Sequence, residues 1–230
     1  MTSRAAVLER MIGDPSQLDP QRMGAVCIDV TATDGAGITL FADGVPQGHL
    51  AATNPISALI EELQFDLGEG PCVDAFRLGR PIMEPDLAQP AERRWVAFSG
   101  AALEAGVAAI FGFPLLIGDS RLGAMDLYRH RPGRLTDGQR TDALLLAGIV
   151  ARRILLAQAL APLGTLAPEV GDQADLRLAV HQAAGMVSAQ LGVTIAEAMT
   201  RLRAHAFGSG RTLQEVAEDV VGRRLRLDEG

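Results

Sequence analysis

Lysine is absent from this chain of 230 residues, and all 21 basic side chains are arginine. Without lysine the protein can form no Schiff base with a carbonyl substrate, and it has no lysine to act as a general base. Walker-type phosphate loops and the phosphate sites of kinases also require a lysine. The absence of this one residue type therefore excludes several classes of enzyme.

Cysteine is scarce, since the sequence has only Cys27 and Cys72. Two cysteines cannot build a disulfide scaffold, and they fall short of the four ligands of a typical structural zinc site. The HExxH and CxxC patterns, a glycine-rich phosphate loop and a Ser–His–Asp order are also missing. We therefore predict a protein that is not an enzyme and that has no metal site and no cofactor.

Long apolar runs free of charge are missing as well, which argues against a transmembrane helix. The first eleven residues contain Arg4, Glu9 and Arg10 and lack the apolar segment of a signal peptide. Apolar residues make up 48% of the chain, enough for the core of one or two domains. These features are typical of a cytoplasmic protein, which is what we predict.

Acidic charge is unevenly distributed along the chain, whose formal net charge is −7. Residues 1–160 hold 14 arginines and 19 acidic residues, whereas residues 173–230 hold seven of each. Residues 161–172 contain two prolines and two glycines, which disfavour regular structure. We predict a first domain over 1–160, a linker over 161–172 and a second domain over 173–230.

Two β-hairpins are predicted in the first domain. The β-rich runs 37–41 and 49–53 lie on either side of an Asp-Gly turn. The runs 109–117 and 122–128 lie on either side of a Gly-Asp turn. Consecutive antiparallel strands of this kind indicate an antiparallel sheet.

Helical stretches separate and follow the hairpins, at 56–65, 72–78 and 91–105. A long helix is predicted over 136–160, with Thr136 as its N-cap. This helix is apolar on most sides, so one side can cover the sheet and another can meet a second subunit. Together these elements predict an α+β fold, an antiparallel sheet flanked by helices.

The second domain shows helical spacing without strand signals. Its first helix is closed by a glycine, and Thr194 with Glu197 predicts a capping box for a second helix that reaches about residue 205. Thr212 with Glu215 predicts a second capping box, which opens a short third helix. The prediction is a small all-α unit of three helices, the last two of them short.

Several motifs occur in a fixed order along the chain. The first domain contains DGAGITL at 34–40, GEGPCVDA at 68–75 and LGAMDLY at 122–128. The second contains QAAGMV at 182–187, LR at 202–203 and LQEVAEDVV at 213–221. The first set resembles a GAF domain of the subtype found in actinobacterial regulators, and the second set resembles an ANTAR domain.

This resemblance implies a signal-responsive transcription antitermination regulator that acts as a homodimer. A GAF-like sensor would control a three-helix ANTAR-like module, and the module would bind hairpins in nascent RNA. The residues that the resemblance assigns to RNA binding are Gln182, Ala183, Gly185, Arg201, Arg203, Arg211 and Thr212.

The sequence departs from the ANTAR pattern at three positions. Ala184 stands where the family usually has lysine, and Thr212 and Gln214 stand where it often has a basic residue. Basic side chains supply most of the sequence-independent affinity for nucleic acid. An alternative is therefore a non-enzymatic sensory and dimerisation protein whose tail has lost RNA binding and acts through protein partners.

Sensor-pocket candidates lie in the first domain, and the signal is an unidentified small molecule or protein. Cys72 is a redox-sensitive thiol, a covalent anchor for a cofactor, or a small buried apolar residue. Trp95 either lines a pocket or fills the core, and Asp126 faces either the pocket or solvent. The full set of candidates is Phe65, Cys72, Trp95, Phe113 and Asp126. We expect the signal to enter around residues 65–100 and the helix 136–160 to transmit it to the tail.

Overall fold

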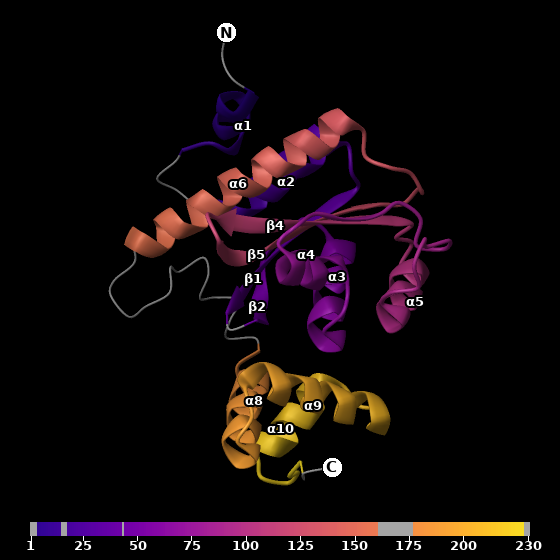
Figure 1. Ribbon diagram of the computed structural model, residues 1–230, viewed down its shortest axis with the longest axis vertical. Coiled ribbons are helices and arrows are strands. Elements are labelled where there is room, and N and C mark those ends of the chain that lie inside the picture. Colours follow the sequence, from indigo (N-terminus) through magenta and orange to yellow (C-terminus); the bar gives the residue numbers. More distant parts are fainter. Residues whose placement is uncertain (1–3, 15–17, 43, 161–176, 228–230) are drawn as a thin grey trace.

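The computed structural model describes residues 4–14, 18–42, 44–160 and 177–227 (Figure 1). A sheet covered by helices extends to residue 160, and a compact group of three helices forms the tail beyond it. The predicted linker at 161–172 lies outside the described residues, so the domain boundary stays a prediction.

Five strands form one sheet, in the order β2-β1-β5-β4-β3. The first hairpin pairs β1 (Gly35–Ala42) with β2 (Val45–Ala52), and the second pairs β4 (Ala109–Ile117) with β5 (Ser120–Arg129). Each pair of neighbouring strands is antiparallel, which confirms the two predicted hairpins and the predicted antiparallel sheet. The edge strand β3 (Ile82–Glu84) was not predicted, because three residues are too few for an alternating pattern.

One face of the sheet is covered by α2 (Pro20–Thr31) and α6 (Asp137–Leu160), with α1 (Arg4–Ile12) packed against both helices. Alternate side chains of the two central strands point to this face and join its apolar core. They are Phe111, Phe113 and Leu115 of β4 and Met125 and Leu127 of β5. The period-two alternation of a strand sends the residues between them to the opposite face.

The opposite face is covered by α3 (Pro55–Leu67), α4 (Pro71–Leu78) and α5 (Val96–Glu104). Helix α5 begins five residues later than the predicted stretch 91–105. Its first turn is capped by Glu69, whose Oε1 accepts hydrogen bonds from the backbone amides of Ala97 and Phe98 at 2.9 Å. A carboxylate suits this position because the helix N-terminus leaves amides unpaired and carries partial positive charge.

Helix α6 confirms the long helix predicted at 136–160, and Thr136 caps it by accepting from the amide of Gln139. By length and composition alone, it is also the one helix among the described residues that could cross a membrane. Leu146 and Val150 are nevertheless fully buried against the sheet. The buried Arg153 donates to the carbonyl of Gly13 at 2.8 Å. These contacts are those of a core helix.

The tail consists of α8 (Leu178–Leu191), α9 (Ile195–Ser209) and α10 (Leu213–Val221). Helix α9 is not short, since it spans 15 residues and continues beyond residue 205 to a left-handed cap at Gly210. Thr194 caps it, but Glu197 pairs with Arg201 at 3.1 Å instead of completing the predicted box. The box formed by Thr212 and Glu215 is complete.

Because the capping box of α10 is complete, the stability of this helix should depend on the side chain of Thr212. We expect Thr212→Ala to destabilise this helix by about 1 kcal/mol, because the substitution removes a side-chain acceptor from the first turn. Hydrogen exchange of the α10 amides, followed by mass spectrometry, measures the loss. Thr200→Ala is the matched control, since Thr200 is exposed within α9 and its hydroxyl donates to the carbonyl of Ala196 in the same helix. Equal loss of protection in the two variants contradicts the prediction.

Candidate functional site

Polar side chains form a buried cluster between the sheet and helices α3 and α4. Gln64 of α3 donates from Nε2 to Asp126 Oδ2 on β5, and its Oε1 accepts from the backbone amide of Cys72 at 2.7 Å. Thr39 of β1 donates to Glu61 Oε2 on α3. Cys72 lies at the start of α4, so four elements contribute to the cluster.

Two carboxylate oxygens of the cluster are unsatisfied. Glu61 is 3% exposed and Asp126 is 2% exposed, yet Glu61 Oε1 and Asp126 Oδ1 have no hydrogen-bond partner among the described residues. Burial raises the pKa of both carboxyls, because an ionised group is poorly solvated there. Burial likewise raises the pKa of the Cys72 thiol. A shared proton or a bound cation would satisfy the two oxygens.

A second set of contacts joins α3 to the tail. Phe65 is buried in the apolar cluster of the tail, together with Val45 of β2. The guanidinium carbon of Arg177 lies 3.7 Å from the centroid of the Phe65 ring, in cation–π geometry. The edge of His181 meets the same ring, with the centroids 6.1 Å apart. Phe65 therefore lies at the interface between α3 and the tail.

Arg203 of α9 makes the polar part of this interface. Its Nε and a terminal nitrogen donate to the backbone carbonyl of Phe65 at 3.0 and 2.6 Å. That carbonyl lies near the C-terminal end of α3, where helix carbonyls lack partners and carry partial negative charge. Burial lowers the pKa of Arg203 to about 10. Arg203, one of the three arginines that the ANTAR resemblance assigns to RNA, is thus bound to the end of α3.

A cleft of about 290 Å³ opens beside this interface. It combines acidic, basic and aromatic side chains from both parts of the chain. They are His49, Glu62, Phe65, Asp66, Arg177 and Gln214.

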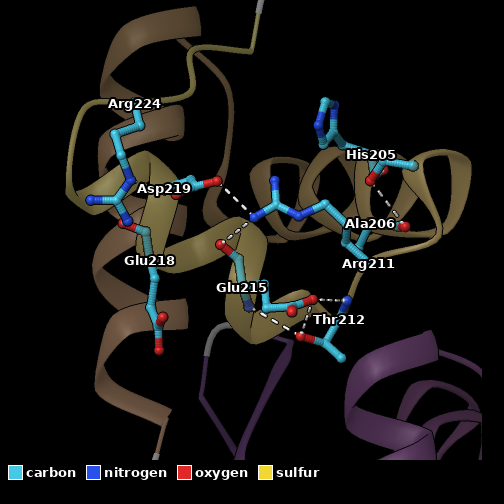
Figure 2. Close-up of polar contacts among 9 residues, drawn as sticks. His205, Ala206, Arg211, Thr212, Glu215, Glu218, Asp219 and Arg224 are labelled. Atoms are coloured by element: carbon cyan, nitrogen blue, oxygen red, sulfur yellow. Dashed lines mark hydrogen bonds and ion pairs between the residues drawn. The ribbon is translucent and has the colours of Figure 1, made fainter.

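The outer side of the tail carries an arginine network (Figure 2). Arg211 donates to Asp219 Oδ2 at 2.7 Å and to the carbonyl of Glu215 at 3.2 Å. Arg224 donates to the other oxygen of Asp219 at 2.6 Å. Asp219 thus pairs with two guanidinium groups, and Figure 2 shows its carboxylate between Arg224 and Arg211.

Sequence comparison matches each of the two parts of the chain to a known domain family. Residues 14–154, more than half of the chain, match the GAF domain, and residues 172–221 match the ANTAR domain. The chain belongs to the GAF domain family. Its C-terminal helices form an ANTAR domain, as the motifs predicted.

Solved GAF domains share the fold of the first part. One comes from a phosphoenolpyruvate-protein phosphotransferase of Coxiella burnetii, with 16% identity, a TM-score of 0.51, and coverage of 68% of this chain and 98% of that one. Another comes from an Acinetobacter phosphoenolpyruvate-protein phosphotransferase, with 14% identity, a TM-score of 0.51, and coverage of 70% and 98%. These likenesses establish the fold alone. A search of curated proteins finds no match to this chain.

The GAF fold brings only some of the predicted sensor residues together. Cys72 and Asp126 meet in the buried polar cluster. Trp95 is buried on the same face of the sheet and donates from Nε1 to Asp74 Oδ2 at 2.9 Å, so it fills the core. Phe113 points to the α6 side and cannot line a pocket with Cys72. Phe65 faces the ANTAR domain.

The predicted RNA-binding residues of the ANTAR domain are also divided. Gln182, Arg211 and Thr212 are exposed, and Gly185 and Arg201 are partly exposed. Ala183 is fully buried in the three-helix core, which corrects its assignment as an RNA contact. Ala184 is buried in the same core, so its side chain does not face solvent.

Sequence reasoning missed three residues with distinctive environments. Glu61 and Gln64 of α3 were not among the predicted site residues, because polar residues on a helix usually face solvent. Phe207 of α9 is 77% exposed, the most exposed aromatic side chain that the structure describes in the ANTAR domain. Its neighbours in the sequence are small and polar, which is the one cue that could have singled it out.

The raised pKa values of Glu61 and Asp126 predict that the free energy of unfolding depends on pH. A chelator in the buffer keeps any cation away from the two carboxyls during the measurement. Each buried carboxyl holds its proton more tightly in the folded than in the unfolded chain. The free energy of unfolding should therefore fall as the pH rises from the ordinary carboxyl pKa through the raised one. Glu61→Gln should weaken this fall and stabilise the protein by about 1–3 kcal/mol near pH 8.

Urea denaturation at a series of pH values measures the effect. Glu62→Gln is the control, because Glu62 is the exposed neighbour of Glu61 on the same helix. A pH profile of Glu61→Gln that coincides with that of Glu62→Gln contradicts the prediction.

Proposed function

We propose that this protein is a signal-responsive regulator of transcription antitermination, in which the GAF domain controls RNA binding by the ANTAR domain. The presence of both domains in one chain supports this function. The RNA partner would be hairpins in nascent transcripts, and the signal would be a small molecule or a protein that acts on the GAF domain. The proposal includes a cytoplasmic location and no catalytic activity.

The contact of Arg203 with the Phe65 carbonyl carries the proposal. The N–H groups of Arg203 that donate to this carbonyl cannot donate to a phosphate at the same time. RNA and the end of α3 therefore compete for the same side chain. A signal that shifts α3 would change how much of the protein is competent to bind RNA.

A homodimer would place two ANTAR domains together. Helix α6 supports this arrangement, because it retains exposed apolar side chains although its inner side is buried in the core. These side chains are Leu144, Leu155, Leu156 and Leu160. We propose that this outer side of α6 meets the same side of a second copy.

The alternative function is a sensory and dimerisation protein that does not bind RNA. Two observations favour it. Ala184, at the position of the family's lysine, is buried and uncharged. Arg211, another arginine that the resemblance assigns to RNA, is paired with Asp219 at 2.7 Å within the tail.

Titration of the purified protein with a fluorescently labelled two-hairpin RNA distinguishes these functions. The RNA-binding function requires binding that weakens as salt rises, and a loss of affinity in Arg203→Ala and Arg211→Ala. Arg140→Ala is the matched control, since Arg140 is exposed on α6. A dimer without affinity for RNA at low salt supports the alternative.

Weakening the interface should release Arg203. We expect Phe65→Leu to raise the affinity for RNA by about threefold to tenfold, because a larger fraction of the molecules becomes competent to bind. Phe76→Leu is the matched control, since the Phe76 ring stacks on Phe41 within the GAF domain. The same RNA titration measures both variants, and unchanged affinity in Phe65→Leu contradicts the competition.

The exposed ring of Phe207 is placed for base stacking. We expect Phe207→Ala to weaken RNA binding by about 1–3 kcal/mol, the typical contribution of an aromatic side chain stacked on a base. Thermal stability should be unchanged, because the ring is 77% exposed. Leu178→Ala is the control, an exposed apolar residue on α8. Equal effects of the two variants on RNA affinity argue against stacking.

A further inference from the structure

We propose that Glu61, Cys72 and Asp126 bind a divalent transition-metal ion that accepts thiolate and carboxylate ligands together, such as Zn²⁺ or Fe²⁺. The three residues come from α3, α4 and β5, and each offers one ligand atom. These atoms all lie within 4.8 Å of one another, and all three side chains are buried. The site does not depend on the proposed RNA binding.

The spacing of the ligand atoms suits such an ion. Metal–sulfur distances of about 2.3 Å and metal–oxygen distances of about 2.0–2.2 Å place the ligand atoms of one ion about 3–4 Å apart. Small rotations of side chains that already converge would close the remaining gap. Three protein ligands also leave a fourth position for water or a signal molecule.

The unsatisfied oxygens provide the second line of evidence. Glu61 Oε1 and Asp126 Oδ1 are buried and find no hydrogen-bond partner in the described part of the chain, and such atoms are costly unless they are paired. A proton shared between the carboxyls would satisfy these two oxygens, and the Cys72 thiol could then donate to Asp126, but neither contact would bring all three ligand atoms onto one centre. A metal ion uses all three atoms.

The surrounding hydrogen bonds resemble the outer shell of a metal site. Thr39 donates to the second oxygen of Glu61, and Gln64 donates to the second oxygen of Asp126. Gln64 also accepts from the amide of Cys72 at 2.7 Å, which fixes the start of α4 relative to α3. Hydrogen bonds of this kind orient ligand side chains and leave one oxygen of each carboxylate for the ion.

Binding requires the release of protons and involves no oxidation or reduction. The thiol of Cys72 loses its proton to solvent, and any proton on the two carboxyls leaves in the same way. The two carboxylates and the thiolate then carry three negative charges against two positive charges on the ion. Affinity should consequently rise with pH.

Titration of the metal-free, full-length protein with Co²⁺ tests the site. A near-ultraviolet thiolate-to-cobalt charge-transfer band should appear and saturate at one ion per chain. Cys72→Ser should abolish the band, whereas Cys27→Ser should retain it. Cys27 is the matched control, because it is equally buried but lies on the opposite side of the sheet beside Met125.

A second variant keeps the test valid if Cys72→Ser fails to fold. Thr39→Val retains all three ligands but removes the donor to Glu61, and we expect it to bind Co²⁺ about 10–100-fold more weakly. Elemental analysis of the purified wild-type protein should also find zinc or iron. The proposal is overturned if wild-type protein shows no cobalt–thiolate band, or if Cys27→Ser loses the band and Cys72→Ser keeps it. Stabilisation by Glu61→Gln without any metal binding would identify a shared proton instead.

Discussion

Two hydrogen bonds from Arg203 to the Phe65 carbonyl join the ANTAR domain to the GAF domain. The acceptor lies near the end of α3, the helix that also sends Glu61 and Gln64 toward the sheet. One helix therefore contacts both the buried polar cluster and the ANTAR domain. A change in the cluster that moves α3 would move the Phe65 carbonyl with it, since a helix shifts as a rigid element.

Arginine is well suited to this contact. Its planar guanidinium can donate two hydrogen bonds to one acceptor and lie against an aromatic ring, whereas a lysine ammonium is a compact, strongly hydrated charge. Arg203 and Arg177 use these properties around Phe65. The lysine-free composition, which first excluded enzyme mechanisms, is thus compatible with an interface made from guanidinium groups.

The polar cluster raises a different physical problem. Carboxyls beneath a sheet are poorly solvated, so they must be protonated, hydrogen-bonded or bound to a cation. Thr39 and Gln64 satisfy one oxygen each on Glu61 and Asp126 and leave the other two unsatisfied. The Glu61 carboxylate lies against the backbone of β1 at Gly37. A Cβ at this position would overlap the carboxylate, so the missing side chain of glycine leaves the room that Glu61 needs.

Much of the architecture was predictable from the sequence. The hairpins, the long helix at 136–160 and the cap at Thr212 follow from local patterns, because turn residues, apolar periodicity and capping side chains act over a few positions. Strand β3 and the true start of α5 were not predictable. The first has only three residues, and the second depends on Glu69, which reaches across from another helix.

The sequence by itself determined the family, the order of its two domains and the α+β class, since ordered motifs and periodicity are local properties. Only the tertiary structure decided the roles of individual residues. In the folded chain Phe113 lies on the α6 side of the sheet, and Ala183 and Ala184 are buried in the core of the tail. The backbone carbonyl of Phe65 contacts Arg203. The tertiary structure also brought Glu61, Cys72 and Asp126 together from three elements. Those placements depend on strand register and helix packing between distant segments, which no short stretch of sequence encodes.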